Sequence, residues 1–189
     1  MLQKFISGIK NEHLLQKLGK NILSLIDKLI MDQFGVCVLI QLVKNSKDKN
    51  VNKYVANYIK ERNPLSFIQH PYANYVVQNL FNSADMTFCK EIVDCIVENY
   101  LSLSIQKYSS NIVENCIKYG DDATVKKIFK SIIDNNHLES LLNNNYGNFV
   151  LEKIIARLNK EEKNIMIKSL EKIGKLPTLS NCIKNLQFK

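Results

Sequence analysis

The chain has 189 residues, a formal net charge of +8 at pH 7 and 46% hydrophobic residues. That length suits one domain or two very small ones. Only six Gly and three Pro are present, which argues against intrinsic disorder and against an all-β fold rich in tight turns. No run approaches the roughly 18 apolar residues of a membrane span, and the N-terminus lacks the pattern of a secretion signal, so we expect no membrane association.

The cysteines and histidines are scattered along the chain. The five cysteines form no Cys-x-x-Cys pair, and the three histidines have no partner at metal-ligand spacing. We therefore expect reduced, buried thiols, no metal site and no cofactor. The excess of lysine permits nucleic-acid binding but does not establish it.

The first predicted element is the tail of a truncated helical repeat over residues 1–12. Met1–Ile6 matches the end of a pattern that recurs later, so we expect the chain to begin inside such a helix, as a fragment of a longer protein. Four repeats follow. Their predicted bounds are 15–46, 49–82, 85–119 and 121–158.

Each of the four repeats ends in a shared template. An aromatic residue is followed at once by a small one, and apolar residues fall four, five, eight and nine places after the aromatic. The template aromatics, which we expect to pack in the core or between helices, are Phe34, Tyr72, Tyr108 and Tyr146. Their positions differ by 38, 36 and 38 residues, a period typical of helical solenoids.

Between the templates lie further stretches with helical apolar periodicity. They are 21–30, 51–59, 88–97 and 125–133. Each repeat is therefore predicted to be a hairpin of two helices, the second of which carries the template. One repeat cannot bury its own apolar stripe, whereas stacked repeats can, so the predicted fold is an all-α solenoid in one domain over residues 1–189.

The predicted C-terminal cap covers residues 159–189. Asn159 precedes Glu161 and Glu162, which is typical of a helix start, and this helix should end near Lys172. A second, short helix is expected over Thr178–Leu186.

The polar template positions carry the functional prediction. Two and six places after the aromatic lie Asn74 and Gln78, Ser110 and Glu114, and Asn148 and Glu152. These i, i+4 pairs are expected to share one helical face, opposite the buried stripe. Three places after the aromatic stand Tyr75, Asn111 and Phe149, whose flat side chains could stack on a base between repeats.

This pattern of polar and flat residues resembles that of the Pumilio (PUF) family of RNA-binding proteins. The resemblance lies in His70–Gln78, Tyr108–Glu114 and Tyr146–Glu152 and extends over essentially the whole chain. It implies a curved right-handed solenoid, an α-α superhelix of Pumilio-type repeats. It also implies that Ser110, Asn111 and Glu114 read guanine, whose two adjacent N–H donors suit a carboxylate. Asn74, Tyr75 and Gln78 are similarly implied to read uracil.

Two repeats depart from the family pattern. Asn148, Phe149 and Glu152 resemble a uracil reader that would also tolerate guanine, because Glu152 stands in the place of glutamine. The first complete repeat is degenerate and should discriminate weakly, since it presents only Val36, Cys37 and Ile40. With the antiparallel binding of the family, the chain would read 5′-U-G-U-N-3′.

The leading hypothesis is therefore a non-enzymatic binder of single-stranded mRNA. It would recognise a UGU-type core in 3′ untranslated regions and regulate translation or stability, as a cytoplasmic monomer with regulatory proteins on its convex face. One alternative is a nucleolar PUF-like protein that binds structured ribosomal RNA through contacts to the RNA backbone. The lysine content favours this alternative. Another alternative is a HEAT- or armadillo-like solenoid that binds peptides. It predicts no recurring base-reading residues on the second helices.

Overall fold

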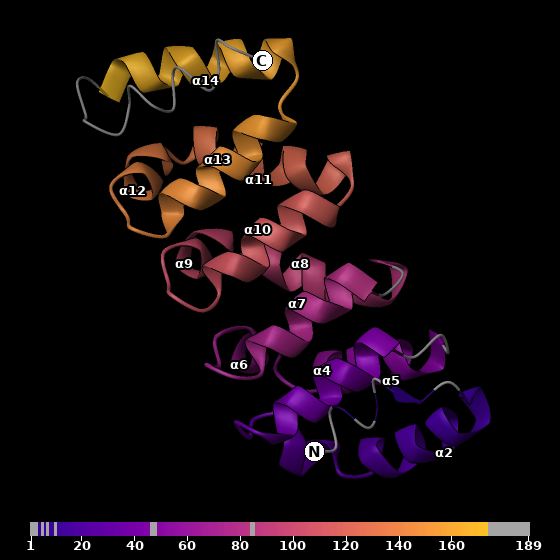
Figure 1. Cartoon of the computed structure of the whole chain (residues 1–189). Coiled ribbons are helices and arrows are strands. Elements are labelled where there is room, and N and C mark those ends of the chain that lie inside the picture. The colour runs from indigo at the N-terminus through magenta and orange to yellow at the C-terminus, as the bar shows by residue number, and fades with distance from the viewer. Residues whose placement is uncertain are drawn as a thin grey trace. The chain divides into compact units, whose positions relative to one another are not determined.

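The computed structural model describes residues 4, 6, 8, 9, 11–45, 49–83 and 86–173. All regular structure in this part of the chain is helical (Figure 1). Contacts between residues divide the chain into two compact units, Met1–Cys95 and Ile96–Lys189, with the boundary inside helix α8 (Lys90–Glu98).

In the first unit a short helix lies between two long ones, and this arrangement occurs twice. In chain order they are α2 (Glu12–Leu23), α3 (Ile26–Leu29), α4 (Gly35–Asn45), α5 (Lys49–Lys60), α6 (Pro64–Ile68), α7 (Asn74–Ser83) and the 3₁₀ turn η1 (Met86–Cys89). The template helices α4 and α7 pack against each other, and α5 packs against α4, α6 and α7.

The second unit repeats this order. Its helices after α8 are α9 (Tyr100–Ser104), α10 (Ser110–Tyr119), α11 (Asp122–Asp134), α12 (Leu138–Leu142), α13 (Gly147–Arg157) and α14 (Lys160–Ile173). The template helices α10 and α13 pack against each other, and the short helices α9 and α12 pack against α10 and α13, respectively.

The apolar stripe predicted from the template forms the core. In α7, Val76, Val77 and Leu80 are fully buried, and the corresponding residues of α10 and α13 are buried to the same degree. Burying one such side chain contributes about 1.5–3 kcal/mol. The stripe therefore contributes several kcal/mol to the stability of these repeats.

Each repeat contains three helices rather than the predicted two. The additional helices α6, α9 and α12 have five residues each, which is too short to show a helical period in the sequence. The predicted helix over 21–30 is likewise two elements, because the chain turns at Ser24 and Leu25 between α2 and α3. The prediction of a two-helix hairpin was wrong in this respect.

A close approach of two backbones explains the small residue after the template aromatic. A Cβ atom on Gly35 would lie 2.8 Å from the carbonyl oxygen of Leu29, and one on Gly147 would lie 2.8 Å from that of Leu141. Glycine thus lets α4 and α13 begin against the preceding short helices. At the same place in α10, the hydroxyl of Ser109 donates to the Leu103 carbonyl at 2.7 Å.

The predicted start of the cap helix is confirmed. Asn159 and Glu162 form a reciprocal capping box at α14, in which each backbone N–H donates to the other side chain at 2.9 Å. The helix is described as far as Ile173, the last described residue, so its predicted end near Lys172 stays a prediction. The predicted helix over Thr178–Leu186 and most of Met1–Ile6 lie outside the described residues.

Candidate nucleic-acid interface

The candidate base-reading residues lie on the template helices. In the first unit α4 packs against α7, and in the second unit α10 packs against α13 (Figure 1). Each pair of helices therefore brings the residues of two consecutive repeats to neighbouring positions. The predicted i, i+4 spacing holds in every case, because residues 36–40, 74–78, 110–114 and 148–152 are helical.

In α7, the two amides are joined. Gln78 Nε2 donates to Asn74 Oδ1 at 2.8 Å, and Asn74 Nδ2 donates to the His70 carbonyl oxygen at 2.7 Å. Both ends of the Asn74 amide are therefore engaged and its orientation is fixed. Gln78 keeps its Oε1 acceptor and one N–H donor, and Tyr75 stands beside it with 49% of its surface exposed.

The structure corrects one part of the predicted geometry. Asn74 and Ser110 are only 1% and 3% exposed, so they do not lie opposite the buried stripe. Each residue advances about 100° around a helix, which places the second position after the aromatic at roughly 90° from the middle of the stripe. The third position lies opposite the stripe, and for that reason Tyr75, Asn111 and Phe149 are the most exposed of the three sets.

In α10, Glu114 is half-buried beside charged groups from α13. Burial raises the pKa of Glu114 above its usual value, the ammonium of Lys153 opposes this rise, and the carboxylate of Glu152 adds to it. The carboxyl group is thus partly desolvated, which strengthens any hydrogen bond that it accepts. Asn111 is exposed next to it, and Ser110 lies at the margin of the core.

In α13, the amide of Asn148 has no internal partner like that of Asn74. Its Oδ1 is shielded from solvent and accepts no hydrogen bond. Residue 152 is a glutamate, which is exposed, and Phe149 presents 52% of its surface. The flat stacking residue is therefore retained, while the polar pair differs from that of α7.

The degenerate repeat has the same position on its own helix. Val36 of α4 is buried, as Asn74 is in α7, and Cys37 and Ile40 are partly exposed. None of these side chains offers a strong donor or acceptor. This surface can contact a base only through apolar packing.

The template aromatics lie nearer the surface than predicted. Phe34 is 74% exposed and Tyr72 and Tyr146 are 36% exposed each, while Tyr108 is partly buried. Phe34, Tyr72 and Tyr146 are therefore not core residues, and the other part of the prediction, packing between helices, stays a prediction for the two tyrosines. They precede the first helical turn, so the periodicity that buries the stripe does not yet apply to them.

A capping device that sequence reasoning missed fixes the start of three template helices. The residue two places before the aromatic accepts from the N–H groups of the aromatic and of the small residue after it. In α7 the acceptor is His70 Nδ1, at 3.2 Å from both nitrogens. Asp32 and Asn144 accept in the same way before α4 and α13. The sequence contained the signal for this device, because a residue with an acceptor side chain stands two places before the aromatic in these three repeats.

Both arginines connect segments that lie more than 30 residues apart in the sequence. Arg157 Nη1 donates to the Ile117 carbonyl at 2.7 Å, and its Nη2 forms an ion pair with Asp122 at 2.8 Å. Arg62 Nη2 pairs with Asp27 at 3.1 Å. Arg157 therefore connects α13 with the C-terminal end of α10 and the start of α11, and Arg62 connects the residues after α5 with α3.

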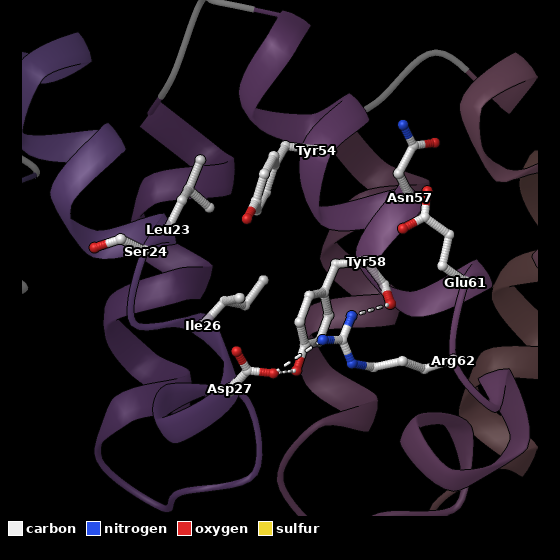
Figure 2. A pocket seen from close by; sticks show the side chains of 9 residues that line it. All are labelled: Leu23, Ser24, Ile26, Asp27, Tyr54, Asn57, Tyr58, Glu61 and Arg62. Carbon is white, nitrogen blue, oxygen red and sulfur yellow. Dashed lines mark hydrogen bonds and ion pairs between the residues drawn. The ribbon is translucent and has the colours of Figure 1, made fainter.

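A separate hollow of 350 Å³ surrounds Arg62 in the first unit (Figure 2). The guanidinium lies 3.6 Å from the ring centroid of Tyr58, and the Tyr58 hydroxyl donates to Asp27 at 2.6 Å. Burial, together with this hydrogen bond, raises the pKa of Tyr58 to about 12. The hollow lies between α2–α3 and α5 and includes none of the predicted base-reading residues.

Two absences concern only the described residues. Within them, no group of three or more His, Cys, Asp or Glu side chains gathers as metal ligands would. None of the helices in the same ranges is long and apolar enough to cross a membrane.

Comparison with known proteins assigns the family. Residues 65–97 match the Pumilio-family RNA binding repeat, and residues 98–189 match the NOP9-like PUF repeat domain. The chain belongs to the Pumilio (PUF) repeat family. This assignment decides against the HEAT- or armadillo-like alternative.

PUF proteins of known sequence and structure resemble much of the chain. Pumilio homolog 12 of Arabidopsis thaliana is 32% identical over 138 residues, which are 73% of this chain and 22% of that protein. PUF-8, solved in complex with PBE-RNA, matches with a TM-score of 0.84 at 18% identity, over 98% of this chain and 56% of that one. The RNA-binding domain of yeast Puf5p, bound to AAT2 RNA, matches with a TM-score of 0.80 at 16% identity, over 100% and 54%.

These structural matches confirm the predicted all-α fold of Pumilio-type solenoid repeats. The chain spans about half the length of the solved chains and about a fifth of the length of the first curated relative.

Proposed function

We propose that this chain binds single-stranded RNA in a sequence-specific way and catalyses no reaction. The observation that carries the proposal is the recurrence of polar residues at the second and sixth template positions on three helices, with an exposed residue between them. Hydrogen bonds to base edges and stacking on flat side chains are how proteins read unpaired RNA. The similar PUF-8 and Puf5p domains hold RNA in their structures, which supports the proposal.

The base assignments follow the family resemblance. Glu114 would accept from N1–H and N2–H of guanine, and Gln78 with Asn74 would meet the edge of uracil. The order of the repeats then gives the core 5′-U-G-U-N-3′, in which Val36 and Ile40 face the last base. Stacking on Tyr75 and Phe149 would contribute about 1–3 kcal/mol per base.

The biological role that fits this chemistry is post-transcriptional regulation. Binding to a UGU-type core in mRNA 3′ untranslated regions would alter translation or stability in the cytoplasm. We propose that the chain acts as a monomer and that regulatory proteins bind its convex face.

A titration with short RNAs tests the proposal. Two unpaired oligonucleotides that differ only in UGU against UCU should bind with a difference of about fivefold or more, since a good base contact discriminates by about 1–3 kcal/mol. Equal affinity for both RNAs would contradict sequence-specific reading.

Two observations favour a second candidate function, in which the chain binds structured ribosomal RNA through contacts to the RNA backbone. The NOP9-like match covers residues 98–189. Lysines also concentrate away from the template helices. The template helices carry only Lys44, Lys118 and Lys153, whereas α11 and α14 carry Lys126, Lys127, Lys130, Lys160, Lys163, Lys168 and Lys172. Such binding would depend steeply on salt and little on sequence, so the same titration at two salt concentrations separates the candidates.

A further inference from the structure

The hollow around Arg62 contains one guanidinium of the chain itself, which shows how its lining holds a cation. The Arg62 guanidinium lies 3.6 Å from the centroid of the Tyr58 ring, and its Nη2 pairs with Asp27 at 3.1 Å (Figure 2). An aromatic face and a carboxylate thus act together on one cation. Arg62 and the Tyr58 hydroxyl both donate to Asp27 Oδ1, so Asp27 Oδ2 takes part in neither contact.

Helix α5 presents a second aromatic ring one turn earlier. Tyr54 stands four residues before Tyr58, as Tyr58 stands four residues before Arg62, so the three lie along one side of the chain's helical path. Tyr54 is 47% exposed and lines the same hollow. Among the described residues, no cation lies over its ring. This ring is therefore accessible to a cation from outside the chain.

The charges of the lining favour a basic ligand. Its nine residues include two carboxylates and one guanidinium but no lysine, although the whole chain carries a net charge of +8. Asp27 compensates the Arg62 charge, whereas Glu61 is exposed and has no ion pair within the described ranges. An RNA phosphate or an acidic peptide would be repelled by the Glu61 carboxylate, and a cation would be attracted to it.

The remaining lining suits a long side chain with a charged end. The buried Leu23 and Ile26 contribute apolar surface, against which the methylene groups of an arginine can pack. A volume of 350 Å³ is near the lower end of the range of ligand sites, about 300–1,000 Å³, and suits a single side chain. A guanidinium fits better than an ammonium, because it is planar, stacks on aromatic rings and pairs with a carboxylate through two N–H groups.

An exposed apolar residue beside the hollow points to a protein as the source of this side chain. Leu25 is 49% exposed and stands between the lining residues Ser24 and Ile26. Together with Tyr54 it gives a partner protein apolar contacts next to the charged ones, whereas a free small cation would leave Leu25 in water.

We propose that the hollow binds an arginine side chain of a partner protein. The guanidinium of that arginine would stack on Tyr54 and donate to Glu61, and its stem would cover Leu23 and Ile26. The site lies within the first unit and includes no base-reading residue. It therefore goes beyond the proposed RNA binding and does not depend on it.

An NMR titration of the full chain with N-acetylarginine amide tests the proposal. Saturable shifts should appear in the backbone amide signals of α3 and α5. N-acetylcitrulline amide has nearly the same shape without the charge, and it should bind about threefold or more weakly, since a cation–π contact and an exposed ion pair are both lost. Equal binding of the two compounds, or arginine-induced shifts that gather elsewhere on the chain, would overturn the proposal.

Variants of the exposed lining residues sharpen the test. Tyr54→Ala and Glu61→Gln should each weaken arginine binding about twofold to fivefold. Tyr75→Ala is the matched control, because Tyr75 is 49% exposed in the same unit but does not line the hollow, and it should leave arginine binding unchanged. Melting temperatures would verify folding. Undiminished binding in Tyr54→Ala or in Glu61→Gln would overturn the proposal.

RNA titrations of the same two tyrosine variants separate this site from the proposed function. Tyr54→Ala should bind the UGU oligonucleotide as the native chain does, whereas Tyr75→Ala should bind it more weakly. RNA binding that is unaffected by Tyr75→Ala would count against the proposed base reading and leave the arginine site standing. A loss of RNA affinity in Tyr54→Ala would contradict the independence of the two sites.

Discussion

Helices α4 and α10 are held by the same kinds of packing contact, but they carry different side chains at the base-reading positions. Each begins against a short helix, with Gly35 or Ser109 at the close approach, and each packs against the next template helix of its unit. Yet α10 presents Ser110, Asn111 and Glu114, whereas α4 presents Val36, Cys37 and Ile40.

The comparison shows that folding and base reading depend on different template positions. The buried stripe and the small residue specify the helix and its packing. The second, third and sixth positions can be apolar without loss of the fold, because Val36 occupies a site as buried as that of Asn74. A PUF-type fold alone therefore does not determine which bases are read.

The largest expected effect concerns the close approach between a template helix and the short helix before it. Gly35→Ala and Gly147→Ala should each lower the free energy of unfolding by about 1–3 kcal/mol, since each new Cβ meets backbone at 2.8 Å. Chemical denaturation measures this effect. Gly19→Ala is the matched control, because its Cβ would approach only the flexible Leu42 side chain, at 3.3 Å, and should cause no loss. A neutral result at Gly35 would show that α4 does not need the close approach.

The next effect would transfer reading chemistry onto α4. The triple variant Val36→Asn, Cys37→Tyr and Ile40→Gln copies the α7 set, and the Asp32 carbonyl takes the place of that of His70 as partner for the new asparagine. Affinity for RNA with uracil at the fourth base should rise about fivefold or more. Binding to RNAs that vary at this base measures it, with the melting temperature as a control for folding. No gain in affinity would mean that α4 does not hold these side chains in the way that α7 does.

A pH titration gives the smallest effect, with opposite signs for stability and binding. Because the pKa of Glu114 is raised in the folded chain, protonation favours folding, and this contribution is lost as the pH rises through the raised pKa. Relative to Glu114→Gln, the native chain should gain stability as the pH falls, by less than about 1 kcal/mol after solvent screening.

Guanine binding should respond in the other direction, because only the carboxylate accepts two N–H groups. Affinity for the UGU oligonucleotide should fall as the pH drops through the raised pKa of Glu114, and Glu114→Gln should abolish this dependence. Melting curves and titrations at matched pH values would test both signs. A fall in both quantities together would contradict the role of Glu114.

The sequence was sufficient to predict what repeats with a helical period. The stripe residues Val76, Val77 and Leu80 are buried as predicted, and Asn159 caps the last described helix. The short helix α6 escaped prediction, because five residues complete little more than one turn. Phe34 was misjudged because it precedes the helix whose periodicity was used to place it.

Features that depend on pairs of side chains required the structure. The bond from Gln78 to Asn74, the unsatisfied Asn148 and the influence of Lys153 on Glu114 depend on rotamers and on neighbouring helices. The identities of these residues suggested which positions matter. Their contacts determine which donors and acceptors remain for a ligand.

An exchange of specificity on α10 tests the central claim most directly. The double variant Ser110→Asn with Glu114→Gln should be titrated against RNAs that vary only at the middle base of the core. The account predicts that the preference moves from guanine to uracil at that base and stays unchanged at its neighbours. An undiminished preference for guanine in the double variant would show that these side chains do not read the base.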